Sequence, residues 1–238
     1  MGYEYVLASL PDLKLNSPAP ITTEKLQELL DETMLPKDKP LLAVLQMKND
    51  NPIVLSTLEQ YRDDALSAPA WWEEAEKVLS EEDIRTAILY EYGIKSKKDF
   101  VRSWFQFNED INNVLVATIC RKHNFDVRKL IIGTNEVAEI LRKNISQKDF
   151  GLGGVMSNLN EVMQIVELDN LMEREKHLDA LRFAWLEEQT RFIHFSVENV
   201  LAYYLQCEML NRWDKLTVEE GEQIFRELVS DMKKGISL

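Results

Sequence analysis

The chain has 238 residues, of which 45% are apolar and 29% are charged, with a mean hydropathy of −0.29. This composition is typical of a globular protein and excludes wholesale disorder. The formal net charge of −13 argues against nucleic acid as a partner, because affinity for phosphate groups comes from Lys and Arg side chains.

The distribution of proline predicts an all-α fold. All seven prolines lie in the first 69 residues, and the remaining 169 residues contain none. Proline breaks helices, whereas β-sandwiches and barrels need frequent Gly/Pro turns. We therefore expect repeated helical bundles with long amphipathic helices. Residues 1–10 are expected to form either a short strand or a buried helical turn.

Short helices alternate with loops in the first 95 residues. Thr22 or Thr23 is suited to cap a helix that begins at Glu24, and Pro36 and Pro40 mark its end. Further short segments are expected at 41–47, at 53–61 and after Pro69, followed by a helix that Ser80 caps and that stops near Gly93.

A long helix is predicted next. Ser96 is suited to cap it, and apolar residues at steps of three or four continue from Phe100 to about His123. Such a helix is roughly 40 Å long. Two shorter segments are expected at 127–132 and 134–143.

Three of the eight glycines lie within 150–154, which makes this segment the best candidate for a hinge or domain boundary. Helices are predicted to follow from Asn158, over about 178–212, and after Thr217. We therefore divide the chain into a divergent N-terminal helical module (1–95), a first repeat bundle (96–150) and a second repeat bundle (151–238).

Common catalytic and metal-binding motifs are missing from the sequence. It has no phosphate-binding Gly-rich loop, no nucleophile elbow, no Glu-x-x-His and no Cys-x-x-Cys, its two cysteines being Cys120 and Cys207. We expect no catalytic residue, cofactor, metal or small-molecule substrate. The start of the chain lacks the basic residues of a signal peptide, and no run of about 18 apolar residues occurs, so we expect a cytoplasmic protein with no membrane span.

The two long predicted helices share a local pattern. Aligning Glu109 with Glu208, 99 residues apart, brings Asn112 opposite Asn211. A Glu and an Asn three residues apart lie on one face of a helix, where buried polar groups need partners. The pattern indicates either a duplication, with two similar bundles, or a coincidence between two amphipathic helices.

At these residues the chain resembles a known family. Tyr203–Trp213, preceded by Val200–Ala202, resembles the "Tyr … Lys-Glu … Asn-Leu-Arg" helix of the C-subunit family of V-type/A-type ATPases, whose eukaryotic members are called d subunits. Phe107–Val114 resembles the "Asp-x-x-Asn" helix of that family's other repeats, and Tyr3–Leu13 is similar to the start of its short bacterial form. Cys207 stands where the family often has Lys, and the chain is too short for three complete bundles.

The resemblance implies a non-catalytic central-stalk (rotor) protein of a V/A-type ATPase, which links the membrane proteolipid ring to the central shaft in ion transport. Such a protein lies at the cytoplasmic face of the membrane and is attached only through the ATPase complex. Residues 96–150 carry ten Lys and Arg against seven Asp and Glu. From this basic region we expect Lys97, Lys98, Arg121 and Lys122 to contact acidic surfaces of partners.

Two other function classes stay open. One is a cytosolic all-helical adaptor or regulator that is unrelated to rotary ATPases. The other is an all-α enzyme with an acidic pocket, which would show a deep cleft with converging carboxylates. The rotor interpretation instead predicts a broad, open cavity without strongly perturbed acids.

Overall fold

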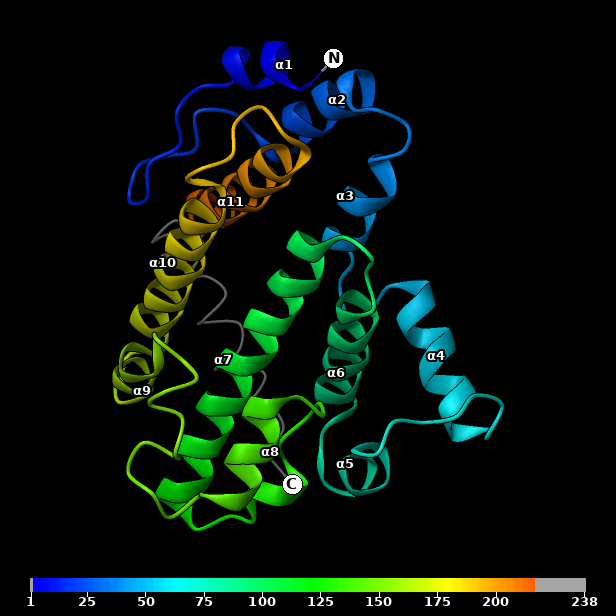
Figure 1. The fold of residues 1–238 in the computed structure, drawn as a ribbon, viewed down its shortest axis with the longest axis vertical. Coiled ribbons are helices and arrows are strands. Elements are labelled where there is room, and N and C mark those ends of the chain that lie inside the picture. Colours follow the sequence, from blue (N-terminus) through cyan, green and yellow to red (C-terminus); the bar gives the residue numbers. More distant parts are fainter. Residues whose placement is uncertain (1, 217–238) are drawn as a thin grey trace, which may run out of the picture. The chain divides into compact units, whose positions relative to one another are not determined.

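The computed structural model describes residues 2–216, which form helices and loops with no β-strand among them. This confirms the predicted all-α fold (Figure 1). The helix expected after Thr217 lies outside the described residues. The chain divides into two compact units. The central unit runs from Pro40 to Leu178, and the terminal unit combines the residues up to Lys39 with those from Asp179 onward.

The boundaries between the two units, after Lys39 and after Leu178, differ from those of the predicted modules 1–95, 96–150 and 151–238. The glycine-rich segment 151–154, which we expected to be a hinge or boundary, lies inside the central unit. There the side chains of Phe150 and Leu152 are fully buried. The duplication behind the predicted modules stays a prediction.

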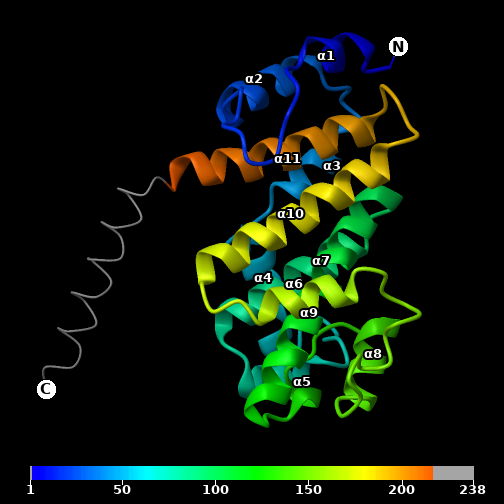
Figure 2. The same cartoon turned by 90° about the vertical axis from the view of Figure 1, so that its left-hand side faces the viewer.

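The helix α7 (Asp99–His123) is the longest element of the central unit, and α6, α8 and α9 pack against it (Figures 1 and 2). Its buried residues recur at steps of three and four, as in Val101, Phe105, Asn108 and Ile111, because this spacing keeps side chains on one side of a helix. The other elements of the unit are α4 (Pro52–Arg62), α5 (Trp72–Val78), α6 (Glu81–Ile94), the 3-10 helix η1 (Val127–Lys129), α8 (Glu136–Lys143) and α9 (Leu159–Val166).

The helix that we expected to stop near Gly93 does so, and Gly93 also marks a close approach of two helices. The helix α6 continues to Ile94, and Gly93 is buried within it. A Cβ atom at Gly93 would lie 2.1 Å from the ring of Phe105 on α7. The glycine therefore allows α6 and α7 to pack closely, while Ser80 caps the start of α6 as predicted.

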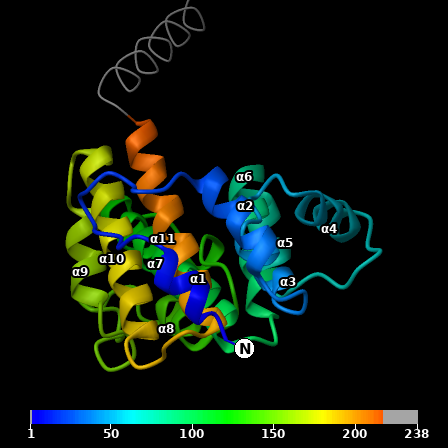
Figure 3. The ribbon, with the colours of Figure 1, turned by 90° about the horizontal axis from the view of Figure 1, so that it is seen from above.

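The terminal unit brings the two ends of the described chain together. It contains α1 (Glu4–Ser9), so the N-terminal segment is a helical turn and not the strand that was the other expectation, with Val6 as its buried residue. It also contains α2 (Thr23–Thr33), which Thr22 caps. The helix α2 packs against α11 (Val197–Lys215), as Figure 3 shows. Two helices cross the borders between the units, α3 (Lys39–Leu45) and α10 (Leu171–Thr190).

Three predicted boundaries are wrong. The single helix expected over 178–212 is two helices, because the chain turns after Thr190 and Phe195 takes a left-handed conformation (φ 56°) before Ser196 caps α11. Lys98, not Ser96, precedes the first residue of α7. Pro40 lies in the first turn of α3, where proline costs no hydrogen bond, so it does not mark a helix end.

Candidate functional site

Two adjacent carboxylates in the middle of α7 share the same two hydrogen-bond donors. The Asn135 amide Nδ2 donates to Glu109 Oε2 at 3.0 Å and to Asp110 Oδ1 at 2.9 Å. Gln106 Nε2 donates to the same two oxygens, at 3.3 and 3.2 Å. Glu109 is only 3% exposed, so these donors hold a carboxylate that is almost removed from water.

Asn135 owes its position to the start of α8. It is the capping residue of that helix, and its Oδ1 accepts a hydrogen bond from the backbone N–H of Ala138 at 2.8 Å. The same side chain thus uses its oxygen for the cap, which leaves its Nδ2 directed at the two carboxylates. Helix capping and site geometry are therefore coupled at one residue.

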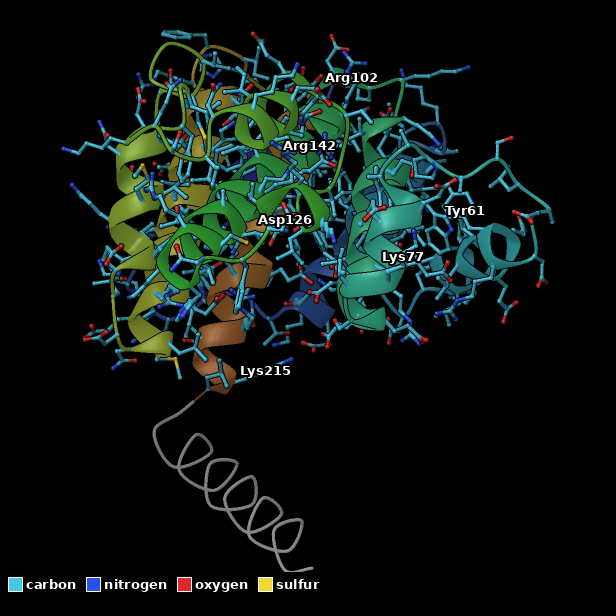
Figure 4. The ribbon with its side chains drawn as sticks, turned by 90° about the horizontal axis from the view of Figure 1, so that it is seen from below. Tyr61, Lys77, Arg102, Asp126, Arg142 and Lys215 are labelled. Carbon is cyan, nitrogen blue, oxygen red and sulfur yellow. The ribbon has the colours of Figure 1, made fainter. Side chains whose placement is uncertain are left out.

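The loop before α8 is fixed by two side chains. Asn113, fully buried on α7, donates to the carbonyl of Ile132 at 2.9 Å and accepts from its N–H at 3.1 Å. Arg142, labelled in Figure 4, donates to the carbonyls of Ile131 at 2.9 Å and Gly133 at 2.7 Å. The backbone that faces Glu109 is thus held from both sides.

Gly133 is required where this loop passes the carboxylate. Its φ is +76°, a conformation that other residues rarely adopt. A Cβ atom here would lie 2.5 Å from Glu109 Oε2, well inside van der Waals contact. The glycine therefore allows the backbone to touch the carboxylate.

Burial sets the proton affinity of the pair. It raises the pKa of Glu109 to about 7, and the nearby negative charge of Asp110 adds to the effect. Burial also raises the pKa of Asp110 to about 6, against the hydrogen bonds from Asn135 and Gln106, which favour the charged form. The two carboxyl groups thus change protonation close to neutral pH.

Glu109 lies in the wall of a pocket with a volume of about 260 Å³. Among its lining residues, Trp71 and Gly133 are buried, whereas Lys95 and Thr134 are exposed. The whole lining belongs to the central unit and consists of Pro69, Trp71, Glu91, Ile94, Lys95, Gln106, Glu109, Gly133, Thr134 and Asn135.

Glu91 is a second carboxylate in the wall of the pocket. It accepts hydrogen bonds from Lys95 Nζ at 2.6 Å and from the hydroxyl of Tyr61 at 3.3 Å. Tyr61 lies on the side of α4 that faces α6 (Figure 4), and its ring meets Trp72 edge-on with centroids 5.2 Å apart. Tyr61, which packs on Trp72, therefore helps to hold the carboxylate of Glu91 in place.

The four residues of the repeated pattern lie in different surroundings. Glu109 belongs to the pocket, but Asn112 is half-buried and it is Asn113 that binds the loop. In the terminal unit, Asn211 Nδ2 donates to the carbonyl of Ile21 at 3.0 Å, while Glu208 is half-buried.

Of the residues at the site, sequence reasoning selected Glu109 and missed the others, which are Glu91, Gln106, Asp110, Asn113, Gly133, Asn135 and Arg142. Three of them, Asn113, Gly133 and Asn135, fix the loop beside the carboxylate. A signal for two of them exists in the stretch Gly133-Thr134-Asn135, where a glycine and a capping residue follow the apolar pair Ile131-Ile132. No sequence signal indicates that Asn135 also reaches the carboxylates.

The four basic residues that we expected to contact partners do not form one patch. Lys97 and Lys98 precede α7, and Arg121 and Lys122 lie in its last turn, roughly 35 Å away at 1.5 Å per residue. Of the four, Lys97 and Lys122 are exposed.

Arg121 is bound within its own unit. Its Nη1 donates to the carbonyls of Gln147 at 2.9 Å and Lys148 at 3.1 Å, and its guanidinium carbon lies 4.1 Å from the centre of the Phe150 ring. Its role in the structure is therefore to hold the 147–150 turn against α7.

The prediction that the rotor interpretation makes about acids is wrong at Glu109 and Asp110, because both have raised pKa values. Two carboxylates, those of Glu91 and Glu109, line the pocket, as the enzyme interpretation expects, whereas Asp110 does not line it. Within residues 2–216, no three His, Cys, Asp or Glu side chains are grouped to hold a metal ion, and no helix is long and apolar enough to cross a membrane.

A family model described as "Protein of unknown function (DUF2764)" matches this chain. It covers residues 54–236, more than three quarters of the sequence. No curated protein and no solved structure matches the chain.

Proposed function

We propose that this chain, which belongs to the DUF2764 family, is a non-catalytic central-stalk subunit of a V/A-type ATPase. In this role it links the membrane proteolipid ring to the central shaft and transmits rotation during ion transport. It carries out no covalent chemistry, and it is held at the cytoplasmic face of the membrane by its protein partners. Three segments of the chain support this role through their resemblance to the ATPase family named above.

The observation that carries the proposal is the contact between two of those segments. Tyr203, at the start of the resembling stretch of α11, donates its hydroxyl proton to the carbonyl of Pro11 at 2.8 Å. The residues are 192 positions apart, and Pro11 lies in the N-terminal segment that also resembles the family. If the two segments resembled the ATPase family only by chance, there would be no reason for them to pack together.

A second observation concerns the predicted duplication, because the two long helices each carry a buried asparagine that binds a loop. Asn113 on α7 and Asn211 on α11 each donate from Nδ2 to the backbone carbonyl of an isoleucine, Ile132 and Ile21 respectively. Each buried asparagine thus ties its long helix to a neighbouring loop. Asn113 and Asn211 are 98 residues apart, whereas Glu109 and Glu208 are 99 residues apart. The two asparagines are therefore one residue out of register with the alignment of the two glutamates.

The packing of α7 suits a mechanical role. A part that transmits torque must deform little under load, and densely packed side chains resist deformation. The helix buries Phe100, Trp104 and Phe105 together with smaller apolar residues along its 25-residue length. Stiffness of this kind is what a rotor needs.

The test is whether the chain is a stoichiometric part of the native ATPase. Membranes from the source organism are solubilised in mild detergent, the complex is purified through a tag on the central shaft, and its components are quantified by mass spectrometry. We expect this chain in an amount equal to the shaft protein, together with the ring. A complex that contains shaft and ring but lacks this chain contradicts the proposal and favours the unrelated helical adaptor.

A further inference from the structure

We propose that the pocket beside Glu109 binds an organic cation, an ammonium or guanidinium group carried on a short apolar stem. The cation is either a free amine or the side chain of a lysine or arginine from a partner protein. The inference concerns the pocket of the central unit alone and does not rest on the rotor proposal.

One oxygen of the buried Glu109 carboxylate has no donor. Oε2 accepts hydrogen bonds from both Asn135 and Gln106, whereas no residue in 2–216 donates to Oε1. Glu109 is 97% removed from solvent and still lines the pocket. A carboxylate oxygen in such a place is stabilised by a donor, and a cation with N–H groups supplies one together with the opposite charge.

The Glu109 carboxylate cannot turn away from the pocket. The backbone of Gly133 touches it, and Asn113 and Arg142 hold the loop that contains Gly133. A ligand therefore meets a charge that is already in place, and little ordering of the site is needed on binding.

The wall beside the carboxylate is apolar. Pro69, Trp71 and Ile94 line the pocket there, which suits an alkyl stem. Trp71 is buried to 93% and meets Trp72 edge-on with ring centroids 6.3 Å apart, so its position is fixed. An indole ring also attracts cations through its π electrons.

The charges around the pocket select a cation over an anion. Glu109 and Glu91 line it, and Asp110 lies directly behind Glu109. Of the cations, Lys95 is paired with Glu91, and Arg142 is engaged by two backbone carbonyls and by Glu139. The carboxylates thus outnumber the basic groups that face the site, and an anionic ligand is repelled.

The test measures binding of two probes to the full chain by isothermal titration calorimetry at about pH 8, where Glu109 is ionised. The guanidinium compound n-butylguanidine is the free probe, and a blocked Gly-Arg-Gly tripeptide represents an arginine in a protein. Binding of n-butylguanidine alone assigns a small-molecule ligand. Binding of the tripeptide as well assigns the side chain of a partner. N-butylurea, a neutral probe with a similar shape, should not bind.

Two variants and a change of pH locate the site. Glu109→Gln keeps the shape and the acceptor oxygen but removes the charge, and we expect it to weaken binding by about tenfold or more. Glu73→Gln, on the exposed side of α5, is the matched control and should bind as the wild type does. Lowering the pH to about 5.5 should weaken wild-type binding by a similar factor, because Glu109 is then protonated.

The expected change of binding with pH involves a small set of ionisable side chains. The ionisable side chains around Glu109 are Asp110 on α7, Glu91 and Lys95 on α6, and Arg142 on α8. Glu109→Gln should therefore flatten the pH dependence as well as weaken binding. The proposal is overturned if neither probe binds at millimolar concentration, or if Glu109→Gln binds as tightly as the wild type.

Discussion

The central and terminal units use a buried asparagine in similar ways but at very different distances along the chain. In the central unit, Asn113 reaches Ile132, 19 residues later, and satisfies both its N–H and its carbonyl. In the terminal unit, Asn211 reaches the carbonyl of Ile21, 190 residues earlier. Both asparagines are buried, but the residues that they bind differ, because Ile132 is buried whereas Ile21 is half-exposed.

This difference follows from how each unit is built. The central unit is one continuous stretch of chain, so its polar contacts close short loops at a small cost in entropy. The terminal unit joins the two ends of the chain and depends on contacts such as those of Tyr203 with Pro11 and Asn211 with Ile21. Its long-range contacts lie nearer to solvent, so each one contributes less to stability.

The largest effect is expected at Asn113. Asn113→Ala leaves two buried backbone groups of Ile132 without partners and should lower the free energy of unfolding by about 3 kcal/mol. Asn211→Ala should cost only about 1 kcal/mol, because the thiol of Cys207 also donates to the carbonyl of Ile21, at 3.4 Å. Urea denaturation followed by circular dichroism measures both. Equal losses would contradict the difference between the units.

Sequence patterns predicted most of the helices and missed how two of them end. Spacing of apolar residues indicated α7, and capping residues indicated the starts of α2 and α6, because these features are local. The turn between α10 and α11 contains neither proline nor glycine, and Phe195 takes the left-handed conformation instead. Reasoning that depends on proline and glycine cannot detect such a turn.

The site was predictable only in part. The repeated pattern selected Glu109, which lies in the pocket, and Asn211, which binds the N-terminal segment. It also selected Asn112 in place of Asn113, because an alignment of two helices cannot tell which of two adjacent asparagines faces the core. The contact between Asn135 and Glu109 joins a loop to a helix 26 residues away, and periodicity carries no information about it.

An intermediate effect is expected from the pH dependence of the central unit. The pKa of Glu109 is raised to about 7 in the folded chain from an ordinary value of 4.5. Between these values the folded chain keeps a proton that the unfolded chain has lost, so the stability contributed by Glu109 falls as the pH rises through this window. At higher pH the folded chain must bury the charge.

Glu109→Gln removes this dependence. Relative to the wild type, the variant should gain on the order of 2 kcal/mol between about pH 4.5 and pH 8. Urea denaturation at a series of pH values measures the gain. Glu208→Gln, at the aligned position in the terminal unit, controls for the loss of one glutamate charge. Parallel pH profiles for Glu109→Gln and the wild type would show that Glu109 is not the titrating group.

The smallest effect separates two neighbouring basic residues at the end of α7. Arg121→Ala loses two hydrogen bonds to backbone carbonyls and the contact with the Phe150 ring, which should cost about 1 kcal/mol of stability. Lys122→Ala should leave the unfolding curve unchanged, because Lys122 is exposed.

The same two positions test the expected partner contact. If the basic end of α7 binds an acidic partner, Lys122→Glu weakens assembly of the complex without a change in stability. The contrary outcome is that Lys122→Glu assembles normally and Arg121 variants impair assembly only as far as they unfold the chain. Arg121 then affects assembly through the fold, and the predicted contact at this end of α7 is wrong.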